Sequence, residues 1–165
     1  MQPLTHVDER GDAHMVDVGD KAITKRSATA EGWIVLPPAA LSAVVERTAK
    51  KGDVLAVAQL AGVQGAKRTS DWIPLCHPLP ISGVEVTLHA ADDRVWARAT
   101  VRTEWRTGVE MEALTAVTAA LLTVYDMVKA VDKGMEIGGV RLLEKRGGRS
   151  GTWRAATREP DATSR

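Results

Sequence analysis

The chain has no phenylalanine, one tyrosine and one cysteine among its 165 residues. Cys76 has no partner for a disulfide within the chain, and the first residues contain no apolar signal segment, so a secreted disulfide scaffold is not expected. No uninterrupted apolar run approaches the ~20 residues that a membrane-spanning helix needs. These absences predict a soluble cytoplasmic protein in which the five tryptophans do the packing that phenylalanine would otherwise do.

Charge of either sign is not in excess either, with 22 Lys and Arg residues against 21 Asp and Glu residues. Without a global positive field, the chain has no general attraction for nucleic acid or an anionic membrane, and any anion site must be a local cluster. The four histidines lack the short spacing of metal ligands and there is no cysteine pair, which disfavours a metal site. We therefore expect no cofactor.

The composition predicts a single domain over residues 1–153, with a flexible start at 1–12 and a disordered polar tail at 154–165. An extended strand is expected at 15–36, before a helix that begins with proline in its first turn. Asp53 is expected to cap a second helix over 54–71.

Three prolines make the segment 72–80 irregular. Alternating residues at 81–90 and 95–103 predict a hairpin, which is followed by a long helix at 107–133 and a strand at 136–145. This order favours the α+β class, with a ferredoxin-like antiparallel sheet and helices packed on one of its faces.

The long helix carries no charge from Ala113 to Tyr125, after which Asp126 and Lys129 lie three positions apart on one face. A helix that is apolar nearly all round is normally a core helix, where charges are costly unless they are paired or used. We therefore expect Asp126 and Lys129 to be buried, with desolvation raising the pKa of the carboxylate and lowering that of the lysine. Such a pair is a candidate acid–base couple. The alternative is an idle ion pair, which contributes little if exposed.

Glu112 shares that helix face but lies fourteen residues, or ~21 Å, from Asp126. This distance is too long for both to act on one bond of a small molecule. Either the two carboxylates serve different sites, or a second subunit brings its own residues to each end of the helix.

Pro74 and Pro78 flank Cys76 and His77, and they restrict the backbone between them. A Cys–His nucleophilic dyad is disfavoured because neighbouring side chains often point apart. His77 is a better candidate for ligand contact or proton transfer because the pKa of histidine lies near neutrality. A rigid turn with a packed cysteine and a surface histidine is the alternative.

Basic residues gather at the breaks between elements, where glycines allow backbone N–H groups and basic side chains to surround phosphates. The motif GxxxxGK[ST] of the P-loop does not occur, so a polyphosphate ligand is suggested but not required. Each residue alone could equally be a solvated surface charge. The set comprises Arg26, Lys50, Lys51, Lys67, Arg68, Lys129, Lys133, Arg141, Lys145, Arg146 and Arg149.

Four segments closely resemble the cyclic pyranopterin monophosphate synthase family of molybdenum-cofactor biosynthesis. They are LTHVDERGDAHMVDV (4–18), KGDVLAVAQLAGVQGAKRTSDWIPLCHPL (51–79), TGVEMEALTAVTAALLTVYDMVKAV (107–131) and VRLLEKRGGRSG (140–151). The match covers almost the whole chain outside both termini. The combination of PLCHP, TGVEMEALTA and YDM-x-KAV is specific to this family rather than to a fold.

The resemblance implies a lyase-type enzyme that converts (8S)-3′,8-cyclo-7,8-dihydroguanosine 5′-triphosphate to cyclic pyranopterin monophosphate with release of pyrophosphate. It also implies a homohexamer, built as a trimer of dimers, with active sites between subunits. The partner is then the cyclised GTP intermediate, with no nucleic acid and no membrane, and Mg²⁺ accompanying the triphosphate is left open.

The resemblance also assigns site residues by position. The family's catalytic aspartate and essential lysine fall on Asp126 and Lys129. The substrate-contacting residues, including further family positions, fall on Leu75, Cys76, His77, Met111, Glu112, Glu110, Lys51, Lys67, Arg26 and Lys145.

Two other classes of protein stand beside this interpretation. One is a regulatory oligomer that binds a phosphorylated ligand without catalysis, in which a buried Asp126 would have no use. The other is an RNA-binding ferredoxin-like module, which needs exposed aromatic residues on paired strands. Only Trp96 and Trp105 lie near the hairpin, and the near-neutral charge disfavours RNA as well.

Overall fold

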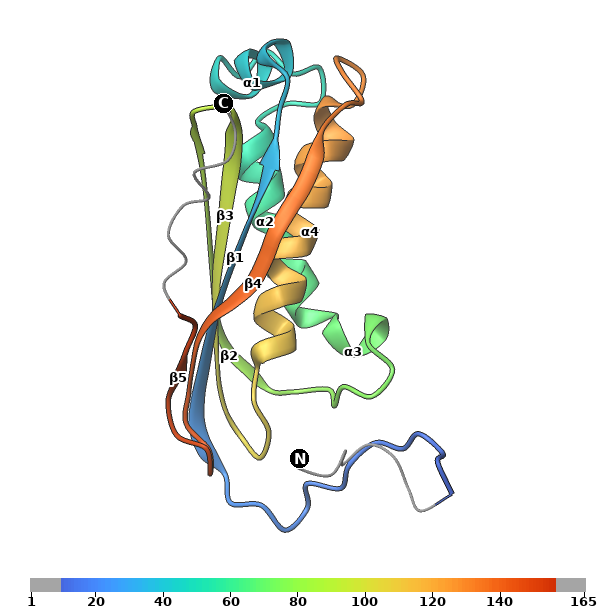
Figure 1. The fold of residues 1–165 in the computed structure, drawn as a ribbon, viewed down its shortest axis with the longest axis vertical. Helices are drawn as coiled ribbons and strands as arrows, with labels where there is room; N and C mark the ends of the chain where they lie inside the picture. The colour runs from blue at the N-terminus through green and yellow to red at the C-terminus, as the bar shows by residue number, and fades with distance from the viewer. Residues whose placement is uncertain (1–9, 157–165) are drawn as a thin grey trace.

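Strands of alternating pattern build one antiparallel sheet, and two helices cover one of its faces (Figure 1). The computed structural model describes residues 10–156. The elements, in chain order, are β1 (Thr24–Val35), α1 (Pro38–Val45), α2 (Val54–Lys67), α3 (Thr69–Trp72), β2 (Ile81–Ala91), β3 (Arg94–Trp105), α4 (Glu110–Val128), β4 (Glu136–Arg146) and β5 (Trp153–Arg154).

The strands lie in the order β2-β3-β1-β4-β5, and every neighbouring pair is antiparallel. Without the short elements α1, α3 and β5, the chain follows a β-α-β-β-α-β order with β3 and β1 at the centre of the sheet. This is the ferredoxin-like arrangement. The predicted α+β fold, with its helices on one face of an antiparallel sheet, is therefore confirmed.

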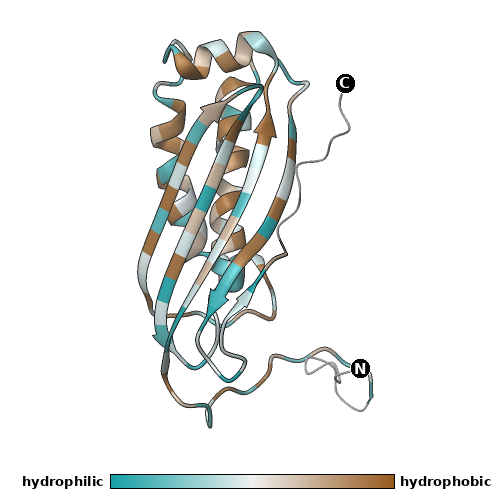
Figure 2. Cartoon of the chain, turned by 60° about the vertical axis from the view of Figure 1, so that its left-hand side comes forward, coloured by the Kyte–Doolittle hydropathy of each residue, from teal (hydrophilic) through white to brown (hydrophobic). Residues whose placement is uncertain are grey.

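The core lies between this sheet and the helices α2 and α4. Small and β-branched residues of the strands are buried in it and alternate with more exposed residues along β1 and β3. The alternation of hydrophobic and hydrophilic residues along the strands is visible in Figure 2. Glycines permit unusually close packing of the two helices. A Cβ at Gly65 would lie 2.6 Å from the Cβ of Ala119, and one at Gly62 would lie 3.0 Å from the carbonyl oxygen of Ala116. The backbone of α2 therefore rests directly on α4.

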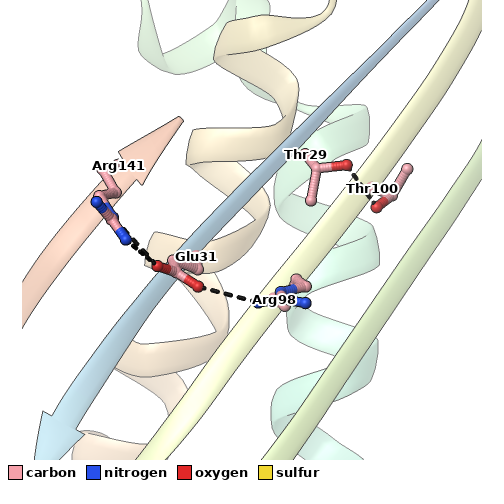
Figure 3. A network of polar contacts seen from close by, with 5 residues as sticks. All are labelled: Thr29, Glu31, Arg98, Thr100 and Arg141. Carbon is pink, nitrogen blue, oxygen red and sulfur yellow. Dashed lines mark hydrogen bonds and ion pairs between the residues drawn. The ribbon is translucent and has the colours of Figure 1, made fainter. Parts of the chain in front are cut away.

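Within residues 10–156 no helix covers the other sheet face, and polar contacts join its strands (Figure 3). Glu31 of β1 accepts hydrogen bonds from Arg141 of β4 at 2.8 and 3.1 Å and from Arg98 of β3 at 3.2 Å. The Glu31 side chain is only 14% exposed, so two guanidinium groups compensate a nearly buried carboxylate. The cluster joins three neighbouring strands.

Two tryptophans also pair on this open face. Trp33 of β1 lies opposite Trp96 of β3, and the guanidinium carbon of Arg94 lies 4.9 and 5.9 Å from the two ring centroids. A cation over both rings stabilises them in place through cation–π attraction. The RNA-binding alternative requires free aromatic faces, and these rings already have a partner.

Local sequence signals, such as helix caps and turn residues, predicted several elements correctly. Asp53 caps α2 by accepting a hydrogen bond from the backbone N–H of Ala56 at 3.1 Å, and Pro38 opens α1. The predicted hairpin is β2–β3, turning at Asp92, whose φ is 56°. The predicted strand 136–145 corresponds to β4.

Several predicted boundaries were wrong. The strand expected at 15–36 begins only at Thr24, because the chain turns at Gly19, whose N–H donates to Asp17 at 2.7 Å. The helix expected at 54–71 divides into α2 and α3, because the backbone of Arg68 leaves the helical conformation with φ −115° and ψ 16°. As a result, Trp72, expected in the irregular segment, ends α3.

The long helix is shorter than the predicted 107–133, because α4 runs from Glu110 to Val128 and Lys129 is its C-cap. Residues 107–109 form a loop before it, and 130–133 form turns after it. Its length and composition would allow it to cross a membrane, but 61% of the relevant window is buried inside the protein. It is a core helix that packs on the sheet.

The predicted tail at 154–165 begins too early. Arg154 lies in β5 and is the strand partner of Glu144 in β4. The N–H of Ala155 donates to the carbonyl oxygen of Leu143 at 2.8 Å. The remainder of that tail, 157–165, lies outside the described residues, as does most of the expected flexible segment 1–12.

The close packing of α2 on α4 leads to a testable prediction about stability. Gly65→Val places a branched side chain against the backbone of Thr115 and the methyl group of Ala119, so the free energy of unfolding should fall by about 1–3 kcal/mol. Gln59→Val introduces the same residue on the exposed side of α2 and is the matched control. Urea unfolding that gives equal stability for the two variants would contradict this packing.

Candidate active site

The candidate residues form two groups at opposite ends of α4. We call the first the α4 N-terminal pocket, a cavity of about 240 Å³ whose lining includes Glu112 and His77. We call the second the lysine cluster, which consists of Lys51, Asp126 and Lys129.

The α4 N-terminal pocket forms where the first turn of α4 meets the proline-rich segment after α3. Six of the predicted substrate-contacting residues line it, although they come from two segments about 35 positions apart in the sequence. They are Leu75, Cys76, His77, Glu110, Met111 and Glu112. The structure thus brings together residues that sequence reasoning could relate only through the family resemblance.

Glu112 is the most perturbed group in this pocket. Its side chain lies in the first turn of α4 and the residue is only 4% exposed. Burial raises the pKa of Glu112 to about 7, and the nearby charge of Glu110 adds to this effect, while a hydrogen bond from its own backbone opposes it. Near neutral pH this carboxyl group can therefore either donate or accept a proton.

Cys76 and His77 lie beside Glu112, and both are half-buried. Burial raises the pKa of the Cys76 thiol, and the charge of Glu112 raises it further. The thiol is therefore held in its protonated form, which argues against a nucleophilic thiolate. This agrees with the sequence interpretation, which disfavours a Cys–His nucleophilic dyad.

Lys67 reaches the same region from the end of α2. It lines a smaller cavity of about 80 Å³ that shares His77, Leu79 and Glu112 with the α4 N-terminal pocket. A cation is therefore available next to the pocket, on the side of α2.

At the other end of α4, Asp126 lies between two lysines. Lys129 Nζ is 2.7 Å from Asp126 Oδ1, and Lys51 Nζ is 2.7 Å from Asp126 Oδ2. Lys51 also donates to the backbone carbonyl of Asp126 at 3.0 Å. These hydrogen bonds, first from Lys129 and then from Lys51, lower the pKa of Asp126 to about 2.

Two expectations for this pair were wrong. The side chains of Asp126 and Lys129 are 54% and 49% exposed, so the pair is not buried. The pKa of Asp126 is lowered rather than raised, because ion pairing dominates over desolvation. The property expected of Asp126, a buried carboxyl group with a raised pKa, belongs to Glu112 instead.

Arg26 and Lys145 lie at the same end of the sheet as the pocket. Arg26 donates to the carbonyl groups of Trp105 and Arg106 at 3.0 and 3.2 Å, directly before the pocket residue Thr107. Its guanidinium group also packs against Gly148, whose φ of +73° belongs to the glycine-rich turn after β4. Lys145 donates to the hydroxyl group of Ser150 in that turn.

Sequence reasoning missed one cationic residue of the pocket. Lys21 lines it together with Val16 and Val18. Lys21 was missed because a strand was expected over 15–36, which would place Val16, Val18 and Lys21 in the sheet and not beside the pocket. The available signal was Gly19-Asp20, a turn-forming pair.

No three His, Cys, Asp or Glu side chains within residues 10–156 converge in a way that could hold a metal ion. What the described chain offers is lysines at one end of α4 and a protonatable carboxyl group at the other. Together with the sheet topology, these define an α+β protein of ferredoxin-like fold with the residue types of a small-molecule acid–base enzyme.

Comparison with known proteins identifies the family. The sequence model of the MoaC family matches residues 15–148. A cyclic pyranopterin monophosphate synthase of Cereibacter sphaeroides is 59% identical over 94% of this chain and 99% of its own length. Synthases of the same name from Thermomicrobium roseum and Rhodospirillum rubrum are 58% and 59% identical over 93% of this chain, and over 94% and 93% of their own lengths. The chain belongs to the MoaC family.

The perturbed carboxyl group predicts a pH-dependent stability. The pKa of Glu112 is about 7 in the folded chain against about 4.5 in the unfolded chain, so the folded state binds the extra proton between these values. Stability therefore falls as pH rises through that window, by about 1.4 kcal/mol for each unit of pKa difference. Glu112→Gln, which mimics the protonated group, should lose this contribution. Unfolding free energies at about pH 5 and pH 8 that change equally in both proteins would contradict the assignment.

Proposed function

We propose that this chain is a cyclic pyranopterin monophosphate synthase, a lyase that converts (8S)-3′,8-cyclo-7,8-dihydroguanosine 5′-triphosphate to cyclic pyranopterin monophosphate and pyrophosphate. The observation that carries this proposal is the identity of about 59% to synthases of that name over nearly the full length of both chains. We further propose that it acts in the cytoplasm and without a resident cofactor.

The overall conversion defines the chemistry that the site must perform. A triphosphate that becomes a cyclic monophosphate retains its α-phosphorus, so a hydroxyl group of the substrate attacks that phosphorus and pyrophosphate leaves. Negative charge then develops on the leaving oxygen, and fixed cations stabilise it. In our proposal Lys51 and Lys129 supply this charge, and Asp126 holds their ammonium groups in place.

The ring rearrangement needs proton transfers near neutral pH. Glu112 is suited to them because the pKa of its carboxyl group is about 7, whereas Asp126, with a pKa of about 2, stays ionised and serves as an acceptor. His77 and Glu110 orient the base beside Glu112. Lys67, Arg26, Lys145 and Lys21 are cations that would bind the phosphates from the pocket side.

One copy of the chain does not bring these two groups together. Glu112 and Asp126 are fourteen residues apart on one straight helix, or ~21 Å along its axis. We propose that each active site takes the lysine cluster from one copy and the α4 N-terminal pocket from another. A homohexamer arranged as a trimer of dimers is the assembly that the family resemblance implies.

Turnover of the cyclised GTP intermediate, followed as pyrophosphate release, tests the reaction. Lys51→Ala, Lys129→Ala and Asp126→Asn should each lower kcat by about 100-fold or more, because each removes a charge that acts on the leaving group or fixes it. Lys25→Ala changes an exposed lysine of β1 that belongs to neither group of site residues and should retain full activity. Full turnover by correctly folded Asp126→Asn would refute the role of Asp126, and no turnover by the unaltered protein would refute the function.

Mixing two inactive variants tests the shared site. Lys51→Ala lacks a working lysine cluster and Glu112→Gln lacks a working pocket, so coexpression should restore about a quarter of the sites, those that combine two unaltered halves. Lys51→Ala with Lys129→Ala is the control, since both changes fall in the same half. Tags of different kinds on the two chains verify mixed assembly. Mixed particles without recovered activity would show that the site lies within one chain.

A further inference from the structure

Gly108 lies in the loop between β3 and α4 and lines the α4 N-terminal pocket. The space that a side chain would need at this position is already filled. A Cβ at Gly108 would lie 2.6 Å from the carboxyl carbon of Glu110 and 2.8 Å from Oε1 of the same group, which is closer than van der Waals contact allows. The Glu110 carboxyl group thus folds back over residue 108, into space that is open only because this residue is glycine.

The backbone of Gly108 gives no other reason for glycine at this position. Its φ lies outside the left-handed region, so alanine could adopt the same backbone conformation. The loop is also held in place on both sides. Val109 is only 1% exposed, and Arg26 donates to the carbonyl groups of residues 105 and 106 at 3.0 and 3.2 Å. A side chain at residue 108 would therefore displace the free end of Glu110 and not the loop.

The position of the Glu110 carboxylate matters because its charge acts on Glu112. This charge adds to burial in raising the pKa of Glu112, and both side chains line the same pocket. The other charged or titratable groups at this end of α4 are Lys21, Arg26, Lys67, Cys76, His77 and Lys145. The three atoms nearest to a Cβ at Gly108 all belong to Glu110. Residue 108 therefore controls one specific charge among the several around Glu112.

We propose that Gly108 is a positioning residue of this pocket, which lets the Glu110 carboxylate fold over the loop and act on Glu112 through its charge. Gly108 itself offers no chemistry to the substrate. Its contribution is to hold two carboxyl groups of one helical turn in a fixed relation, so that the first governs the pH at which the second exchanges its proton. The inference deepens the proposed function, on which its importance for turnover rests.

Direct titration of Glu112 tests this role without any substrate. Gly108→Ala drives the Glu110 carboxylate toward solvent, which weakens its repulsion of the charged form of Glu112. The pKa of Glu112 should then fall by about half a pH unit, the scale expected for a like charge a few ångströms away in partly hydrated protein. Carbon-13 NMR of the full-length protein, labelled at the glutamate carboxyl carbon, measures this pKa, and Glu112→Gln identifies the signal. An unchanged pKa in folded Gly108→Ala overturns the inference.

Gly83→Ala is the matched control. The φ of Gly83 also lies outside the left-handed region, and a Cβ there would lie 3.9 Å from Nη1 of Arg102, in ordinary contact. This variant introduces the same methyl group on β2, outside the lining of the pocket, and should leave the pKa of Glu112 unchanged. A fall equal to that of Gly108→Ala would show a general effect of replacing glycine and overturn the inference.

A double-mutant cycle shows whether residue 108 acts through Glu110. Glu110→Gln keeps the shape of the side chain and removes its charge, so the pKa of Glu112 should fall at least as far as in Gly108→Ala. Gly108→Ala added to Glu110→Gln should cause no further fall, because the charge that it displaces is already absent. A second fall of the same size would mean that residue 108 acts on Glu112 directly, which overturns the inference.

The pH dependence of turnover separates this role from a purely structural one. In Gly108→Ala, the limb of the kcat–pH profile that reports Glu112 should move to lower pH. The urea unfolding curve should stay unchanged, because the displaced atoms are the free end of a flexible side chain. A uniform loss of turnover at every pH with an unchanged pKa of Glu112 would assign Gly108 to substrate access and overturn the inference.

The outcomes for this role and for the proposed function are separable. A lowered pKa of Glu112 in Gly108→Ala, together with an unaltered protein that releases no pyrophosphate, would support the inference and refute the proposed function. Pyrophosphate release by the unaltered protein, with the pKa of Glu112 unchanged in Gly108→Ala, would do the reverse.

Discussion

The close contact between α2 and α4 is the constraint on which the rest of the structure depends. Glycine at positions 62 and 65 lets the backbone of α2 rest on α4 with no side chain between them. Because the two helices run in opposite directions, one contact sets both ends at once. It holds Lys51, just before α2, against Asp126 near the end of α4, and it holds Lys67 near the pocket of Glu112. A looser packing would separate the groups at both ends.

The same helix therefore creates two environments for carboxyl groups. Glu112 lies in the first turn of α4, where the surrounding protein buries it. Desolvation is therefore the main cause of its raised pKa. Asp126 lies in the last turn of α4 at the surface, where two lysines and water favour the charged form of its carboxyl group. The direction of each shift follows from position along α4 and not from residue type, which is why an apolar sequence background alone does not predict it.

The sequence predicted the sheet pattern and the local signals well, because alternation and caps such as Asp53 act over a few residues. It failed at 15–23, where a turn competes with strand-like composition. It also failed at Asp126, since an uncharged helix was interpreted as buried all round although one side of it reaches the surface. His77 and Glu112 were candidates from the sequence itself, but Leu75, Glu110 and Met111 were named only by family resemblance. Lys21 was missed, because pockets are made by segments that meet only in the folded chain. The burial of Glu112 depends on the same long-range packing.

The exposure of the lysine cluster has a consequence for how its charge acts on dissolved anions. Two lysines and one permanently ionised aspartate leave a net positive charge at a surface that water and dissolved ions reach freely. Exposed charge of this kind is screened by dissolved salt, with a Debye length of about 8 Å at physiological ionic strength. Glu112 is shielded from those ions by the protein around it. The charge at one end of α4 is thus sensitive to ionic strength and the ionisation of Glu112 at the other end to pH, so the two ends of this helix respond to different properties of the surrounding solution.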